Sequence, residues 1–295
     1  MVTYLPRLYT FEESNSESVM KSFIIIFLCL LFVSCNETNG PLTDSTDEVP
    51  SESVLIPLSP INSQIVMSIR EEITSSKRNV ILSFCTTELY SPAGAKIIGS
   101  INKENNIIQV DLQDIKMPEA GAAISTPASV SFMLDSIPND NYSLQITING
   151  KKVIGLIKVS DESFEIKTQP NNIISYQQNN LLRIPENIIW GQSESIQQST
   201  YKQFLDSLKI FGAKAHNLKP GDYSYFEIDS QGNFNTHSAL GMSFGEFFLF
   251  SFQGDTLITR SLIKRFSKRY LDSIYIQFSG GRGEMYYSTV LRNEP

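Results

Sequence analysis

The amino-acid sequence predicts a β-rich chain with two folded parts, a β-sandwich followed by an α+β domain. Residues 54–168 contain short strand-like segments separated by turns rich in proline, glycine and asparagine. Beyond residue 186, two segments with apolar residues at every third or fourth position alternate with further strand-like segments. The 295 residues are 41% apolar and 19% charged, so the chain can bury packed cores. These observations favour a globular protein of mixed class over a disordered one.

The first element of the chain is its one long apolar run, KSFIIIFLCLLFVSC, from Lys21 to Cys35. As a helix its uncharged part would be about 20 Å long, too short for a hydrocarbon core of roughly 30 Å. A lysine before the run and the small Ser34 near its end are typical of a secretory signal. Met20 directly precedes the lysine, so we expect translation to start there and residues 1–19 to be an untranslated or disordered lead.

The end of this run, LFVSC, resembles the lipobox of bacterial lipoproteins, in the form found in Bacteroidota. The resemblance implies that residues 20–35 are a lipoprotein signal peptide and that Cys35 is lipidated and becomes the new N-terminus. Phe32 stands where the motif usually has leucine, and Leu31 lies one position earlier. The lipid would anchor the protein in the cell envelope, at the outer membrane, on its periplasmic or its outer face. The alternative is an ordinary signal peptide in which the cysteine has no role.

A polar segment follows the cysteine, NETNGPLTDSTDEVPSES, residues 36–53. It has almost no apolar residues to bury, so we expect it to be a flexible tether. The net charge of −7 argues against nucleic acid as a partner. Of the three cysteines only Cys85 lies in the part expected to fold, and the chain has two histidines. We therefore expect neither a metal site nor a cofactor.

Residues 54–168 are expected to form a β-sandwich of the immunoglobulin-like kind, because several short strands alternate with turns. The clearest piece is NYSLQITINGKKVIGLIKV, in which alternate apolar residues from Tyr142 to Ile148 share one face and Asn149-Gly150 forms the turn. The phrase SIPNDNYSLQITINGKKV resembles the closing hairpin of bacterial immunoglobulin-like modules, and this resemblance implies no functional residues. We expect Cys85 to be a buried apolar residue of a strand.

Residues 169–185 are rich in asparagine and glutamine and contain two prolines, so we expect a linker there. In residues 186–295 the segments ENIIWG, DYSYFEID, EFFLFSF and SIYIQFSG are predicted strands. Apolar periodicity predicts helices near 201–211 and 258–270. The resulting order β-α-β-β-α-β is typical of the ferredoxin-like fold, although other α+β arrangements remain open.

The second predicted helix carries a basic face that includes Arg260, Lys264 and Lys268. Such a face can bind anionic lipid headgroups or acidic glycans. The alternative is an ordinary solvated face of a helix whose other side packs on a sheet. In the segment SGGRGE, glycines around Arg282 could form an anion-binding nest, or simply a bend between two strands.

Three aromatic residues near predicted strand ends, Trp190, Tyr223 and Tyr225, could form a platform for sugar rings. The alternative is that they pack in the core. No catalytic motif with hydrolase spacing is present, no pair of carboxylates stands out, and both histidines, His216 and His237, lie in polar segments. We therefore expect a non-catalytic envelope lipoprotein that binds a glycan or another envelope protein. The alternatives are a secreted hydrolase or its accessory subunit, and a structural spacer.

Overall fold

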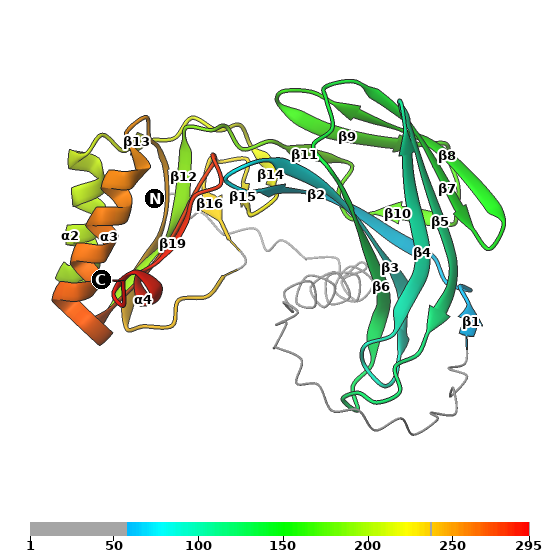
Figure 1. The fold of residues 1–295 in the computed structure, drawn as a ribbon, viewed down its shortest axis with the longest axis horizontal. Helices are drawn as coiled ribbons and strands as arrows, with labels where there is room; N and C mark the ends of the chain where they lie inside the picture. Colours follow the sequence, from blue (N-terminus) through cyan, green and yellow to red (C-terminus); the bar gives the residue numbers. More distant parts are fainter. Residues whose placement is uncertain (1–57, 237, 295) are drawn as a thin grey trace, which may run out of the picture.

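The computed structural model describes residues 58–294 except His237. Half of the structure is strand and 14% is helix, arranged as a large mixed sheet of 14 strands and a smaller antiparallel sheet of five strands with three helices. Figure 1 shows the large sheet curling at the right, while the small sheet and its helices lie at the left. The predicted sequence of a β-rich part followed by a part with helices is confirmed at this level.

The large sheet has the strand order β10-β2-β3-β6-β4-β5-β7-β8-β9-β11-β14-β15-β16, with β1 paired to β5. Its strands are β1 Leu58–Pro60, β2 Ile65–Ile73, β3 Arg78–Tyr90, β4 Lys96–Glu104, β5 Ile107–Lys116, β6 Thr126–Leu134, β7 Asn141–Ile148, β8 Lys151–Val159, β9 Ser163–Thr168, β10 Ile174–Tyr176, β11 Asn180–Leu182, β14 Gly221–Tyr223, β15 Phe226–Ile228 and β16 Phe234–Asn235.

Alternation along strands such as β2 and β7 places one face of each strand in a common core. Strand β2 alternates between buried and half-buried residues along its whole length. The predicted hairpin is confirmed: β7 and β8 are antiparallel neighbours, and the turn residues Asn149 and Gly150 have φ values of 46° and 77°. Glycine and asparagine tolerate this left-handed conformation better than other residues, which is why the turn forms there.

The large sheet is continuous, whereas the sequence predicted a sandwich of two sheets. β4 and β6 are joined by one parallel pair, Lys96 with Ser129, and β5 runs parallel to β7. Buried residues from β2, β3, β5, β7 and β8 pack in one cluster, so the curled sheet encloses its core between its own two halves. The pairing of β5 with β7 passes over β6 in sequence, and local alternation does not specify such a partner.

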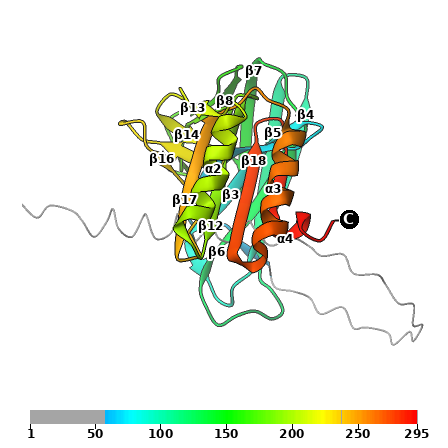
Figure 2. The same ribbon diagram turned by 90° about the vertical axis from the view of Figure 1, so that its left-hand side faces the viewer.

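The small sheet has the order β13-β17-β12-β18-β19. Helices α2 and α3 lie side by side on one face of it (Figure 2), and their apolar stripes pack on β17, β12 and β18. The side chain of Asp255 accepts a hydrogen bond from Leu257 N and caps the start of α3. The elements are β12 Ile188–Ser195, α2 Gln198–Ile210, β13 Lys214–Ala215, β17 Phe244–Ser251, α3 Thr256–Tyr270, η1 Leu271–Ser273, β18 Ile274–Gly280, β19 Met285–Tyr287 and α4 Ser288–Leu291.

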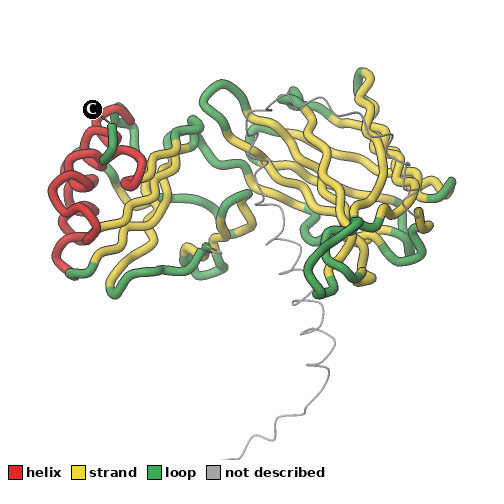
Figure 3. Tube along the Cα trace, turned by 60° about the horizontal axis from the view of Figure 1, so that its bottom comes forward, coloured by secondary structure: helices red, strands yellow, loops and turns green. Residues whose placement is uncertain are grey.

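The segment DYSYFEID does not join the small sheet, contrary to the predicted strand order. It forms β14 and β15, and β14 pairs with β11 of the large sheet. Tyr223, Phe226 and Ile228 of this hairpin are buried against Trp190 and Leu249, which lie on the face of the small sheet that the helices leave uncovered. The hairpin is thus the part of the large sheet that packs on the small sheet, and Figure 3 shows helices only on the far side of the small sheet.

The segment expected to be a linker, residues 169–185, carries two short strands. β10 runs parallel to β2, and β11 pairs antiparallel with β9. These pairings hold the segment against the large sheet. The predicted signal peptide, Cys35 and the tether lie outside the described residues. Within residues 58–294, no helix has the length and apolar character needed to span a membrane.

Candidate ligand-binding site

The predicted aromatic platform is part of a core at the junction of the two sheets. Trp190 and Tyr223 are each only 7% exposed, and the ring of Tyr225 lies 5.3 Å from that of Trp190. Phe226 contacts both Trp190 and Tyr223. Burial raises the pKa of the Tyr223 and Tyr225 hydroxyls. Trp190 and Tyr223 therefore belong to a core, the alternative to an exposed platform for sugar rings, because the β14–β15 hairpin packs on Trp190.

The basic face of α3 is partly occupied by the C-terminal segment. Arg260 forms an ion pair with Glu294, and the ammonium of Lys268 donates to the main-chain carbonyl of the same glutamate at 3.1 Å. Lys264 lies on α3 between these two residues. The basic face thus helps to hold the C-terminal segment. The Glu294 carboxylate offsets part of the positive charge that this face could offer to anionic lipids.

The glycines around Arg282 serve close packing and internal hydrogen bonds. The amides of Gly280, Gly281 and Gly283 donate to main-chain carbonyls of the protein, so they do not point into an open nest. At Gly283, φ is +87° and an added Cβ would lie 2.0 Å from the main chain of Thr74. Arg282 itself is half exposed and lies 4.0 Å from Glu186. The structure does not bring it together with the basic residues of α3.

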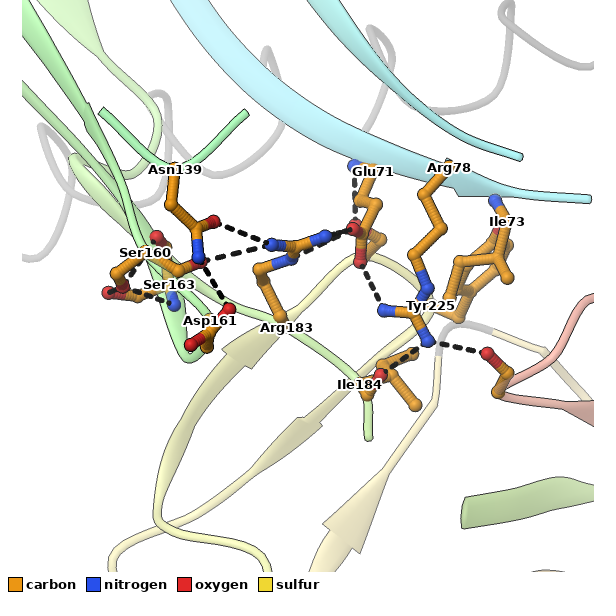
Figure 4. A network of polar contacts seen from close by, with 12 residues as sticks. Glu71, Ile73, Arg78, Asn139, Ser160, Asp161, Ser163, Arg183, Ile184 and Tyr225 are labelled. Carbon is orange, nitrogen blue, oxygen red and sulfur yellow. Dashed lines mark hydrogen bonds and ion pairs between the residues drawn. The ribbon is translucent and has the colours of Figure 1, made fainter. Parts of the chain in front are cut away.

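A buried carboxylate at the junction was missed by the sequence analysis. Glu71 on β2 lies between two guanidinium groups, at 3.3 Å from Arg78 and 2.9 Å from Arg183. Arg78 also donates to the carbonyls of Ile184 and Gly281, just before β12 and just after β18, and so ties the large sheet to one end of the small sheet (Figure 4). This carboxylate is fully engaged by cations, so we assign it a structural role rather than a catalytic one.

A polar hollow of about 290 Å³ lies on the outward face of the large sheet, across β4, β5, β7 and β8. Strand register produces one continuous row of side chains over these strands, and a second row lies two residues along, roughly 7 Å away. The first row is Ser100, Asp111, Thr147 and Lys152, and the second is Asn102, Gln109 and Gln145.

Most of these side chains keep their hydrogen-bonding capacity. Asp111 accepts a hydrogen bond from Gln113 at 2.8 Å. Within the part of the chain that the structure describes, the other six side chains have no hydrogen bond or ion pair. A third row continues the same face with Ile107 and Leu156, which are 39% and 40% exposed and flank Ser143. The site therefore combines hydroxyl, amide, carboxylate and ammonium groups with an aliphatic border.

Sequence alternation alone indicated that these polar residues face outward, but it gave no reason to group them. The hollow depends on the parallel pairing of β5 with β7, which brings Gln109 beside Gln145. No short motif marks that contact, because the two residues belong to strands separated by β6. The sequence analysis therefore missed the site.

Metal-ligating side chains do not gather in the described part of the chain. No group of three or more histidine, cysteine, aspartate or glutamate residues there is arranged to hold a metal ion. Burial lowers the pKa of His216, whose ring accepts a hydrogen bond from Leu218 N. No protein-family model, no curated protein and no solved structure matches the chain.

Proposed function

We propose that the protein is a non-catalytic binding protein of the bacterial cell envelope and that its polar hollow holds a hydroxyl-rich glycan. The observation that carries this proposal is the gathering, in one hollow across four strands, of six polar side chains that have no partner among the described residues. Sugar hydroxyls both donate and accept hydrogen bonds, and serine, threonine, asparagine and glutamine side chains do the same.

The composition of the hollow favours a neutral glycan over a strongly charged ligand. Asp111 and Lys152 contribute opposite charges within the same row, so neither an anion nor a cation is attracted overall. The aliphatic side chains of Ile107 and Leu156 lie beside the polar rows and suit the apolar C–H face of a sugar ring. The volume lies near the lower end of small-molecule sites, roughly 300 Å³, which fits a short stretch of a glycan.

The location in the envelope rests on the lipobox-like LFVSC and the polar segment that follows it. A lipid on Cys35 and a tether over residues 36–53 would hold the two sheets close to a membrane, where envelope glycans are the abundant hydroxyl-rich ligands. At the level of fold relationship, we propose that β2–β9 descend from an immunoglobulin-like sandwich. The crossover from β17 through α3 to β18, with β12 between the two strands, is a split β-α-β unit of the ferredoxin-like kind.

The test is a titration of the full chain with neutral oligosaccharides prepared from bacterial envelope polysaccharide, followed by calorimetry. Replacing both Gln109 and Gln145 by alanine should weaken binding about tenfold or more, because each net hydrogen bond contributes about 1 kcal/mol. A matched control is Gln231→Ala, which removes the same side chain from the turn between β15 and β16 and should leave the affinity unchanged.

Two outcomes would contradict the proposal. If no neutral oligosaccharide binds, or if the double variant binds as tightly as the parent, the hollow is not a glycan site. If only acidic oligosaccharides bind and Lys152→Ala abolishes their binding, the neutral character of the ligand is wrong.

A further inference from the structure

Strand β17 lies at the margin of the small sheet and is largely unpaired on one side. β12 pairs with it along its whole length, from Phe244 to Ser251. On the other side β13 pairs only with Phe250 and Ser251, and Figure 2 shows β13 near one end of β17. In the described part of the chain, the remaining residues of β17 therefore have no neighbouring strand on that side.

The register identifies which main-chain groups point away from the sheet. Phe252 N donates to the carbonyl of Asn187 at 2.7 Å, so this residue faces β12. Because neighbouring residues of a strand face opposite sides, every second residue back along β17 also faces β12. Gly245, Phe247 and Leu249 consequently direct their amides and carbonyls outward. Among the described residues, the outward groups of Gly245 and Phe247 have no hydrogen-bond partner, whereas Leu249 borders the pairing with β13.

Along the margin of β2, another long strand margin, the main-chain groups form hydrogen bonds within the chain itself. Main-chain and side-chain groups from β10, from the segment after it and from the β14–β15 turn cover this margin residue by residue. The bonds are Ile65 N to Ile173 O, Gln177 N to Met67 O, the Gln178 side chain to Ile69 O, Glu71 N to Ser224 Oγ and Ile73 N to the Tyr225 hydroxyl. The fold thus covers the margin of β2 with its own residues and leaves that of β17 open.

The side chains of β17 indicate what kind of strand would fit beside it. On the helix-facing side, the exposed Glu246 lies between Phe244, which is 44% exposed, and the buried Phe248. Glu246 has no ion pair within the described residues. A neighbouring strand is stabilised by opposite charge and by apolar contacts across the pair. The complementary strand would therefore carry a basic residue between two apolar residues at alternate positions.

We propose that β17 binds an extended peptide segment of another protein by strand addition. The segment pairs with Phe244–Phe248 over five residues and ends before the residues that pair with β13. It places a lysine or arginine beside Glu246 and apolar side chains beside Phe244 and Phe248. Main-chain hydrogen bonds supply the affinity and these alternate side chains supply the specificity. This margin has neither lysine nor proline between residues 244 and 249, the residues that usually prevent such pairing.

The test uses a fluorescent peptide of sequence acetyl-Val-Thr-Lys-Thr-Phe-amide and the full chain in mild detergent, with anisotropy as the readout. N-methylation of the two threonine amides, or of the lysine and phenylalanine amides, gives two matched peptides of identical composition. Methylation of the set that faces β17 should weaken binding at least fivefold, and methylation of the other set should leave it unchanged. In the protein, Glu246→Lys should weaken binding of this peptide and favour one with glutamate at the central position.

Three results would overturn the proposal. The first is no binding of the peptide at millimolar concentration. The second is binding that is insensitive to the position of the methyl groups, which would indicate apolar adsorption rather than strand pairing. The third is self-association of the chain that Phe247→Pro abolishes and Phe247→Val preserves, which would assign the margin to a second copy.

Discussion

At the scale of single residues, the decisive interaction is the burial of Glu71 between two arginines. The Glu71 side chain is only 2% exposed. The two guanidinium groups are partly buried as well, with exposures of 20% and 18%. Removing one member of such a group is costly, because the remaining charges stay in a poorly hydrated place without compensation.

We expect Glu71→Gln to lower the free energy of unfolding by about 3 kcal/mol, because Arg78 and Arg183 would lose their counter-charge. Urea denaturation followed by circular dichroism measures this change. Glu186→Gln is the matched control: its carboxylate is 75% exposed and lies 4.0 Å from Arg282, and exposed ion pairs contribute at most about 1 kcal/mol. Equal effects of the two substitutions would show that the buried network is not what stabilises the junction.

At the scale of elements, the end of the chain and α3 stabilise each other. Arg260→Glu should lower the free energy of unfolding by about 1 kcal/mol, because it places two carboxylates together where Arg260 and Glu294 now form an ion pair. Adding Glu294→Arg should restore most of the loss. Thermal denaturation of the two variants measures both changes. If the second substitution gives no recovery, the basic face of α3 is an ordinary solvated face.

Elements with local determinants are the ones that the sequence predicts well. The turn at Asn149-Gly150 depends on residues within a few positions, and it forms as expected. The hairpin of β14 and β15 was assigned to the wrong sheet, because its apolar residues, Phe226 among them, fit either one. Its position is decided by contact with Trp190, far away in the sequence. The polar hollow was missed for the same reason, since its rows depend on long-range strand pairing.

At the scale of the whole molecule, the two sheets share a core and a charge network. Trp190 of β12 packs on Tyr225 and Phe226 of the inserted hairpin, and Ile73 of β2 belongs to the same cluster. The sheets should therefore unfold together. The chain has one tryptophan, so its fluorescence reports on the junction alone, whereas far-ultraviolet circular dichroism reports on all strands.

We expect the fluorescence and circular dichroism transitions in urea to coincide. Phe226→Ala should shift both midpoints equally, with a loss of about 3 kcal/mol from the cavity it leaves. A fluorescence transition that precedes the main loss of strand signal would contradict this expectation. It would mean that the junction opens while the two sheets remain folded.

The contact between Arg78 and Gly281 also affects the order in which the protein folds during its synthesis. The two residues are 203 positions apart in the chain, and ordering so long a loop is slow and entropically unfavourable before its contacts form. During synthesis from the N-terminus, β2 and β3 emerge long before the loop between β18 and β19. The hydrogen bond from Arg78 to Gly281 can form only after this last part of the chain has been made. Until then the network around Glu71 is incomplete and exposed to water.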